Sequence, residues 1–185
     1  CDSLVINMGT LKQNTVRSML LAGKEANQRG HLVVFDPVGV GASRFRKETA
    51  AKLLKQIHFN VIRGNISEIK TLYEGSDDGY GVDAKKDDAV TDGQQIYLID
   101  NGVLDMSRIT GTGCMLDGVI AGFIGANPDQ ILEAVTTAVS AMGICGEYAK
   151  EKAEGTGTLK VHLMDAMSNM NAEWMERSSQ IESKC

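Results

Sequence analysis

The strongest constraint on the fold is a threefold alternation of short apolar runs with helical patterns in the first part of the chain. Runs rich in Val, Ile and Leu, typical of strands buried on both faces, are followed each time by apolar residues at helical spacing. The strand patterns cover residues 3–8, 32–35 and 59–65, and the helix patterns cover 11–29, 45–57 and 66–75. This alternation predicts an α/β fold with a mostly parallel sheet, right-handed crossovers and helices on both faces.

The second part of the chain has a different pattern. Asp100-Asn101-Gly102 lies between two apolar runs, and Asn-Gly in that setting predicts a β-hairpin formed by residues 94–99 and 103–109. Helical spacing then predicts helices over 115–126 and 130–153, and we expect a strand and a helix within 157–170.

Composition excludes several classes of protein. A chain of 185 residues with 43% hydrophobic and 23% charged residues is expected to form one globular domain. Its net charge of −5 and scattered basic residues argue against nucleic acid as a partner, and its apolar runs are too short for a membrane helix. The four cysteines have no CxxC spacing, so reduced thiols in a cytoplasmic protein are expected.

A glycine-rich turn, Gly111-Thr112-Gly113-Cys114, precedes a helix that is apolar on all sides. The first turn of a helix has unpaired N–H groups and a partial positive charge, so this turn is a candidate anion site. The same small residues are also explained by a tight strand-to-helix connection. Cys114 has two interpretations as well: a thiolate stabilised by the helix dipole, or the commoner small buried cysteine.

Charged residues stand at the ends of two predicted strands. Asp36 follows a buried run, where a carboxylate needs a metal ion or an arginine as a partner. Arg63 stands at the end of the next strand, facing phosphate oxygens or a neighbouring acid. Glu68 lies in the first turn of the next helix, where it either stabilises the helix start or faces a cation. Ligands bind at such strand ends in parallel sheets.

Taken together, these segments resemble the hydroxyethylthiazole kinases of thiamine biosynthesis, which have a ribokinase-like fold. The resemblance rests on four stretches: VVFDPVGVGAS at 33–43, VIRGNISEI at 61–69, ITGTGCMLDGVIAGFIGAN at 109–127 and GTGTLKVHLMDAM at 155–167. It extends over residues 4–80 and from 87 to the end of the chain. It implies phosphorylation of the hydroxyl of 4-methyl-5-(2-hydroxyethyl)thiazole with ATP and Mg²⁺.

The resemblance also implies roles for individual residues. Cys114 occupies the position of the catalytic base, where sugar-kinase relatives have an aspartate. Asp36 and Glu68 correspond to the acids near Mg²⁺ and phosphate. The resemblance further implies that Arg63, Asn65 and Gly113 contact ATP and that Gly111 and Gly9 contact the thiazole substrate. It implies a homo-oligomer, a trimer or a multiple of one, with a small-molecule substrate.

Two departures from the family pattern are expected. The family has about two further strand-helix units before the position of Asp2, and a helix and strand with an ATP-contacting Thr-Gly pair between the positions of Ala84 and Asp87. We therefore expect residues 1–185 to be a single but partial kinase domain, incomplete at the N-terminus and near residues 85–86. A start within a strand is compatible with fusion to a thiamine-phosphate synthase, as in fungal bifunctional members.

Two other functions remain as alternatives on the sequence. One is a ribokinase-like kinase for another alcohol, such as hydroxymethylpyrimidine, or a related ATP-dependent dehydratase; Cys114 in place of Asp favours the thiazole kinase. The other is an inactive ligand-binding or assembly module, which the absent segments would favour.

Overall fold

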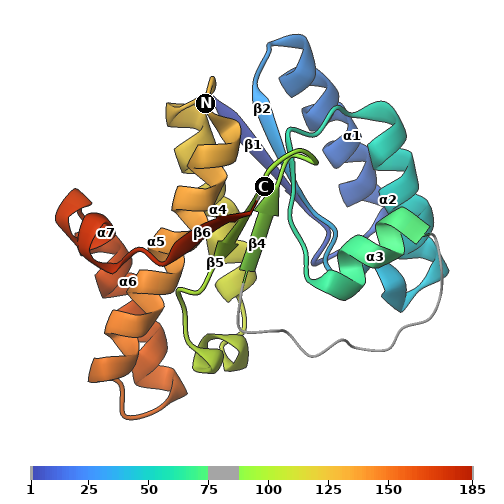
Figure 1. The fold of residues 1–185 in the computed structure, drawn as a ribbon. Helices are drawn as coiled ribbons and strands as arrows, with labels where there is room; N and C mark the ends of the chain where they lie inside the picture. Colours follow the sequence, from blue (N-terminus) through green and yellow to red (C-terminus); the bar gives the residue numbers. More distant parts are fainter. Residues whose placement is uncertain (1, 75–87, 185) are drawn as a thin grey trace. The chain divides into compact units, whose positions relative to one another are not determined.

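The computed structural model describes residues 2–74 and 88–184, drawn in colour in Figure 1. The chain divides into two compact units. The first comprises residues 1–84 and 124–128, and the second comprises residues 85–123 and 129–185. The expected departure near residues 85–86 lies outside the described residues. No helix in the described ranges is long and apolar enough to cross a membrane.

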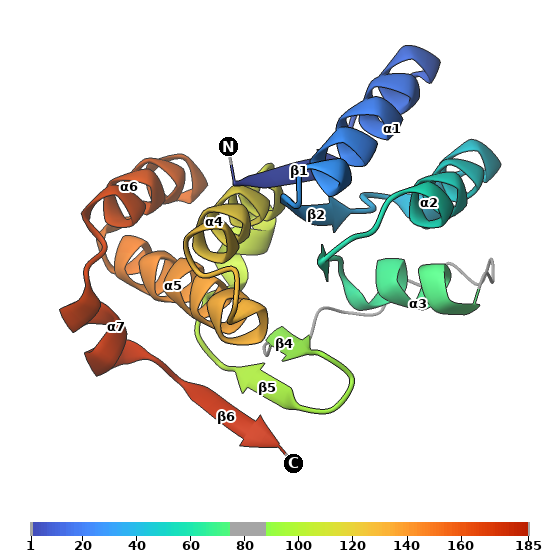
Figure 2. The ribbon, with the colours of Figure 1, turned by 90° about the horizontal axis from the view of Figure 1, so that it is seen from above.

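The first unit contains a three-stranded parallel sheet in the order β1-β2-β3. β1 (Ser3–Asn7) pairs with β2 (Leu32–Asp36), and β2 pairs with the short β3 (Val61–Ile62). The strands alternate with α1 (Gln13–Gln28), α2 (Arg44–Gln56) and α3 (Ile66–Glu74). Figure 2 shows these three helices beside the sheet. The predicted α/β class with a parallel sheet is therefore confirmed.

The register of the sheet follows from its apolar core. Val33, Val34 and Phe35 of β2 are fully buried, as expected for a central strand covered on both faces. Phe35 stacks on Phe59, with ring centroids 4.6 Å apart. In this register Asn7, the last residue of β1, lies opposite Asp36, the last residue of β2. The loops that carry the candidate site thus begin at the same edge of the sheet.

The second unit combines an antiparallel sheet with helices. Its sheet has the order β4-β5-β6, formed by β4 (Asp88–Thr91), β5 (Ile96–Ile99) and β6 (Ile181–Lys184). Its helices are the 3₁₀ helix Leu104–Arg108, most of α4 (Thr112–Ala126), α5 (Ile131–Lys152), α6 (Thr156–Asn169) and α7 (Ala172–Ser178). Leu159 and Leu163 of α6 are buried against Met142 and Cys145 of α5 in a common core.

The predicted hairpin around Asn101-Gly102 is wrong. The hairpin lies one strand earlier, where Asp92-Gly93 joins β4 to β5, and residues 104–108 form the 3₁₀ helix. Gly93 has a φ of +89°, and Oδ1 of Asp92 accepts hydrogen bonds from the N–H groups of Gln94 and Gln95. Asn101 instead binds residues distant in sequence, so the local Asn-Gly signal does not determine this turn.

Two further differences concern the C-terminal part of the chain. The strand expected within 157–170 is absent, because the whole described segment Thr156–Asn169 is helical. Helix α7 and strand β6 were not foreseen. Every residue of β6 is exposed, so the segment has no alternating buried face for a sequence pattern to reveal, and its pairing with β5 defines it as a strand.

Candidate active site

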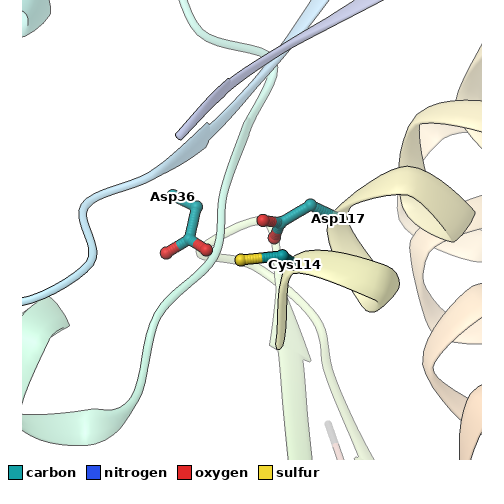
Figure 3. Close-up of side chains that lie close together, drawn as sticks. All are labelled: Asp36, Cys114 and Asp117. Atoms are coloured by element: carbon teal, nitrogen blue, oxygen red, sulfur yellow. The ribbon is translucent and has the colours of Figure 1, made fainter. Parts of the chain in front are cut away.

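Asp36 is the buried carboxylate at the end of β2 (Figure 3). Its Oδ2 accepts a hydrogen bond of 2.8 Å from Nδ2 of Asn7 and a longer contact of 3.5 Å from Nη1 of Arg63. The carboxylate is only 1% exposed, whereas the Arg63 side chain is 31% exposed. Of the two partners predicted for Asp36, a metal ion or an arginine, Arg63 supplies the arginine at the limit of hydrogen-bond distance, so the two predicted residues are brought together within the first unit.

Arg46 of α2 holds the loops after β1 and β2 together. Its guanidinium donates to the carbonyl oxygens of Met8 and Val38 from Nη1, at 2.7 and 2.6 Å, and to that of Gly9 from Nη2, at 2.8 Å. Guanidinium has several donors in a rigid planar fork, which suits such a set of carbonyls. Sequence analysis missed Arg46, because its basic neighbours on α2 made it resemble an ordinary surface residue.

Glu68 and Asn65 form a reciprocal cap at the N-terminus of α3. Asn65 caps the helix, since its Oδ1 accepts from the N–H of Glu68, and Oε2 of Glu68 accepts in return from the N–H of Asn65. Oε1 of Glu68 accepts from the N–H of Gly39, in the loop after β2. Two roles were predicted for Glu68, stabilising the helix start and facing a cation, and these hydrogen bonds correspond to the first. Glu68 also links α3 to the loop that follows Asp36. A carboxylate oxygen retains a second lone pair, so this role is compatible with a cation nearby.

The predicted glycine-rich turn opens α4 in the second unit. Gly111 has a φ of +102°, a conformation that favours glycine, and its carbonyl accepts the first helical hydrogen bond from the N–H of Met115. The N–H groups of Gly113 and Cys114 precede that bond, so they lie in the first turn of α4. Oγ1 of Thr112 donates to the carbonyls of Met106 and Ile109 and fixes the turn.

Cys114 and Asp117 lie one turn apart on α4 and project to the same side of the helix (Figure 3). Cys114 is exposed, which agrees with a site residue and not with a buried structural cysteine. Asp117 is 1% exposed, and one of its carboxylate oxygens lies within 4.8 Å of Sγ of Cys114. Asp117 was missed, although it is the only charged residue in the α4 sequence TGCMLDGVIAGFIGA, which was a usable signal.

The available donors fit a hard cation such as Mg²⁺. Mg²⁺ prefers carboxylate oxygens, whereas soft thiolates suit other metals. Within the first unit, the buried carboxylate of Asp36 therefore fits Mg²⁺ as a ligand. Within the second unit, the buried carboxylate of Asp117 fits such a cation, and the sulfur of Cys114 does not. Each buried carboxylate belongs to a different unit, and each unit by itself offers one such group beside a glycine-containing loop or helix start.

Comparison with known proteins identifies the family. The model of the hydroxyethylthiazole kinase family matches the chain in two stretches, residues 1–88 and 85–173. The chain belongs to the hydroxyethylthiazole kinase family. The two matched stretches meet at residues 85–88, where the sequence analysis expected a departure from the family pattern.

Individual hydroxyethylthiazole kinases align along nearly the whole chain. The enzyme of Clostridium acetobutylicum is 41% identical over 218 residues, which cover 99% of this chain and 80% of that protein. The enzyme of Clostridium beijerinckii is 37% identical, in an alignment that covers 98% of this chain and 77% of that protein. A solved structure, hydroxyethylthiazole kinase from Pyrococcus horikoshii, superposes with a TM-score of 0.89 at 31% identity, covering 100% of this chain and 78% of that chain. The predicted family and fold are confirmed.

Proposed function

We propose that this protein transfers the γ-phosphoryl group of ATP to the hydroxyl of 4-methyl-5-(2-hydroxyethyl)thiazole, in thiamine biosynthesis or salvage. The observation that carries the proposal is the 41% identity to a hydroxyethylthiazole kinase along 99% of this chain. In the reaction a bond forms between the hydroxyl oxygen and phosphorus, the bond from phosphorus to the β,γ-bridging oxygen breaks, and ADP leaves. The hydroxyl proton is lost in the same step.

Mg²⁺ and ATP are the proposed cofactor and phosphoryl donor. Phosphoryl transfer depends mainly on positioning and on neutralising charge, and Mg²⁺ supplies the neutralising charge when it is bound. Asp36 is the proposed ligand, because its carboxylate is buried at a strand end and is contacted there by Asn7 and Arg63. Glu68 is proposed to face the same region from α3. Asn65, Gly113 and the exposed part of Arg63 are proposed to contact ATP.

Cys114 is proposed to face the substrate hydroxyl. Its exposed thiol stands in the first turn of α4, after two glycines whose small size permits close approach of a ligand. Gly111 and Gly9 are proposed to contact the thiazole. A loose transition state requires little early deprotonation, so Cys114 contributes modestly as a base. Asp117 is added to this group because of its proximity to Sγ of Cys114.

The remaining proposals concern the assembly and setting of the protein. We propose that residues 1–185 act as one kinase domain. We also propose that the protein is a homo-oligomer, a trimer or a multiple of one, and that it acts in the cytoplasm.

A two-substrate assay tests the proposed function. The protein is incubated with ATP, Mg²⁺ and either the thiazole alcohol or hydroxymethylpyrimidine, and the phosphate ester and ADP are measured by mass spectrometry. We expect ester and ADP in equal amounts from the thiazole alcohol alone. Ester from the pyrimidine alone, or from neither alcohol with a folded protein, contradicts the proposal.

A further inference from the structure

Asn7 is placed to control the direction of the Asp36 carboxylate. The two residues are partners in the parallel register of β1 and β2 and end their strands at the same level. Nδ2 of Asn7 donates to Oδ2 of Asp36 at 2.8 Å, which is a short contact for an amide and a carboxylate. Arg63 reaches the same oxygen only at 3.5 Å. Asn7 is therefore the closer of these two donors to Oδ2.

The orientation of the Asn7 amide is determined by its second contact. The N–H of Gly9 donates to Oδ1 of Asn7 at 2.7 Å. Since a backbone N–H requires an acceptor, the carbonyl oxygen of the amide faces Gly9 and the NH₂ group faces Asp36. A Cβ at residue 9 would lie 2.9 Å from Oδ1, so glycine at this position leaves the space that the amide occupies.

Arg46 fixes the turn on which this arrangement depends. By binding the carbonyls of Met8 and Gly9, it anchors the two residues after Asn7 to α2. The N–H of Met8 also donates to the carbonyl of Asp36 at 3.0 Å. The Asn7 oxygen therefore accepts from a backbone N–H whose position is fixed. This contact limits the rotation of the amide, so its NH₂ group stays directed at the Asp36 carboxylate.

We propose that Asn7 is a positioning residue for phosphoryl transfer, which holds the Asp36 carboxylate in the orientation that binds the Mg²⁺–nucleotide. This inference rests on the proposed function of Asp36. Partners that orient a ligating carboxylate typically change metal affinity or activity by about 10- to 100-fold when they are removed. The effect of Asn7 on nucleotide affinity is expected to depend on the Asp36 carboxylate.

The substitution Asn7→Ser removes the hydrogen bond to Asp36 while it keeps the hydrogen bond from the N–H of Gly9. A serine at residue 7 still offers an oxygen to the N–H of Gly9, because Ser makes the same turn that Asn makes, but it is too short to reach Asp36. The matched control is Asn27→Ser in the same unit. The Asn27 amide also makes two short contacts, to the carbonyl and the N–H of His58, at 2.9 and 2.7 Å. Asn27 lies in the last turn of α1, before β2 begins, whereas Asn7 and Asp36 are the last residues of β1 and β2.

Three quantities are measured for wild type, Asn7→Ser, Asn27→Ser, Asp36→Asn and the double variant Asn7→Ser/Asp36→Asn. These are the affinity for Mg²⁺ with a non-hydrolysable ATP analogue by calorimetry, kcat and KM with the thiazole alcohol, and the melting temperature. We expect Asn7→Ser to weaken nucleotide affinity or kcat by about 10- to 100-fold, with a melting temperature no lower than that of Asn27→Ser. Asn27→Ser keeps wild-type affinity and kcat. In the Asp36→Asn background, Asn7→Ser has no further effect on affinity.

Two results overturn the positioning role. One is an Asn7→Ser variant with affinity and kcat within twofold of wild type. The other is an equal loss of affinity from Asn7→Ser with and without Asp36. If the wild type makes no thiazole phosphate, the proposed function fails, whereas the calorimetric comparison still decides the role of Asn7: unchanged affinity in Asn7→Ser contradicts it, and weakened affinity that depends on Asp36 supports it.

Discussion

The backbone N–H of Gly39 donates a hydrogen bond of 2.8 Å to Oε1 of Glu68 and ties the loop after β2 to the first turn of α3. Gly39 has a φ of +62°, which favours glycine, so the loop has the shape that presents this N–H. The other oxygen of Glu68 accepts from the N–H of Asn65. One carboxylate therefore determines the relative position of two segments that carry proposed site residues.

Replacement of Glu68 is expected to affect stability and activity together. Glu68→Ala removes the acceptor for two backbone N–H groups and is expected to cost about 2 kcal/mol of unfolding free energy. Glu68→Gln retains one acceptor oxygen and is expected to cost about half as much, and it lowers kinase activity because it removes the negative charge. Urea unfolding and the ATP assay measure the two effects. Wild-type stability in Glu68→Ala would contradict the structural role.

Arg46 and Arg44 form a matched pair on α2. Arg46 donates to three backbone carbonyls, whereas Arg44, with a side chain 91% exposed, pairs with Glu48 one turn along the helix. Arg46→Ala is expected to destabilise the protein by about 3 kcal/mol, since hydrogen bonds from a charged donor to several carbonyls are lost. Arg44→Ala should leave the stability close to that of the wild type, because an exposed ion pair contributes little. Equal effects in urea unfolding would refute the assignment.

Asn101 connects β5, α5 and the C-terminal segment. The buried amide donates to the carbonyl of Ser178 and accepts from Oγ of Ser140 and from the N–H of Gln180, at 2.7 to 2.9 Å. Asn101→Ala leaves these groups without partners and is expected to cost about 3 kcal/mol.

The control for this substitution is Asn169→Ala, at an exposed residue whose amide donates to the carbonyl of Asp165 in the same helix. It should change stability by less than about 0.5 kcal/mol. Thermal unfolding of the two variants compares them directly, and similar melting temperatures would show that Asn101 is not a structural centre of the second unit.

Cys114 and Cys145 are expected to differ in reactivity. Burial raises the pKa of the Cys145 thiol from its ordinary value of 9.0 to about 11. Iodoacetamide at pH 8 should label Cys114 in the folded protein and Cys145 only after unfolding, as peptide mass spectrometry can measure. Because the unfolded thiol ionises near pH 9 and the folded thiol does not, Cys145 contributes full stability below pH 9 and loses that contribution as the pH rises toward 11.

Alanine at the same two cysteines should separate activity from stability. Cys114→Ala is expected to lower kcat by about 100-fold, the low end for loss of a general base, with little change in melting temperature because the side chain is exposed. Cys145→Ala should lower the melting temperature and leave the kcat of the folded fraction unchanged. A Cys114→Ala enzyme with wild-type kcat would exclude a role for its sulfur in proton transfer.

Much of the first unit could be predicted from the sequence, because local signals and tertiary contacts agree there. The apolar run from Val33 to Phe35 predicts a buried strand, and the strand end predicts that Asp36 requires a partner; Arg63 supplies it. The alternation of strands and helices also sets the direction of the strands, since parallel strands need crossover connections.

In the second unit, local signals were less reliable. The Asn-Gly pair at 101–102 has the composition of a hairpin turn, yet Asn101 is held by groups 39 to 79 residues away in the sequence. In α6, Leu159, Leu163 and Ala166 are buried at helical spacing, and this period was present in the sequence but was assigned in part to a strand.

The sequence by itself determined the family, the βα order and the residue types of the candidate site, because these depend on short stretches and on periodicity. Only the tertiary structure decided which donors reach those residues. Asn7 and Arg46 have ordinary sequence contexts, and their contacts arise because parallel pairing brings the ends of β1 and β2 to one level beside α2. Hydrogen bonds depend on distances of a few tenths of an ångström, and for residues 29 and 38 positions apart in the chain such distances are set by packing.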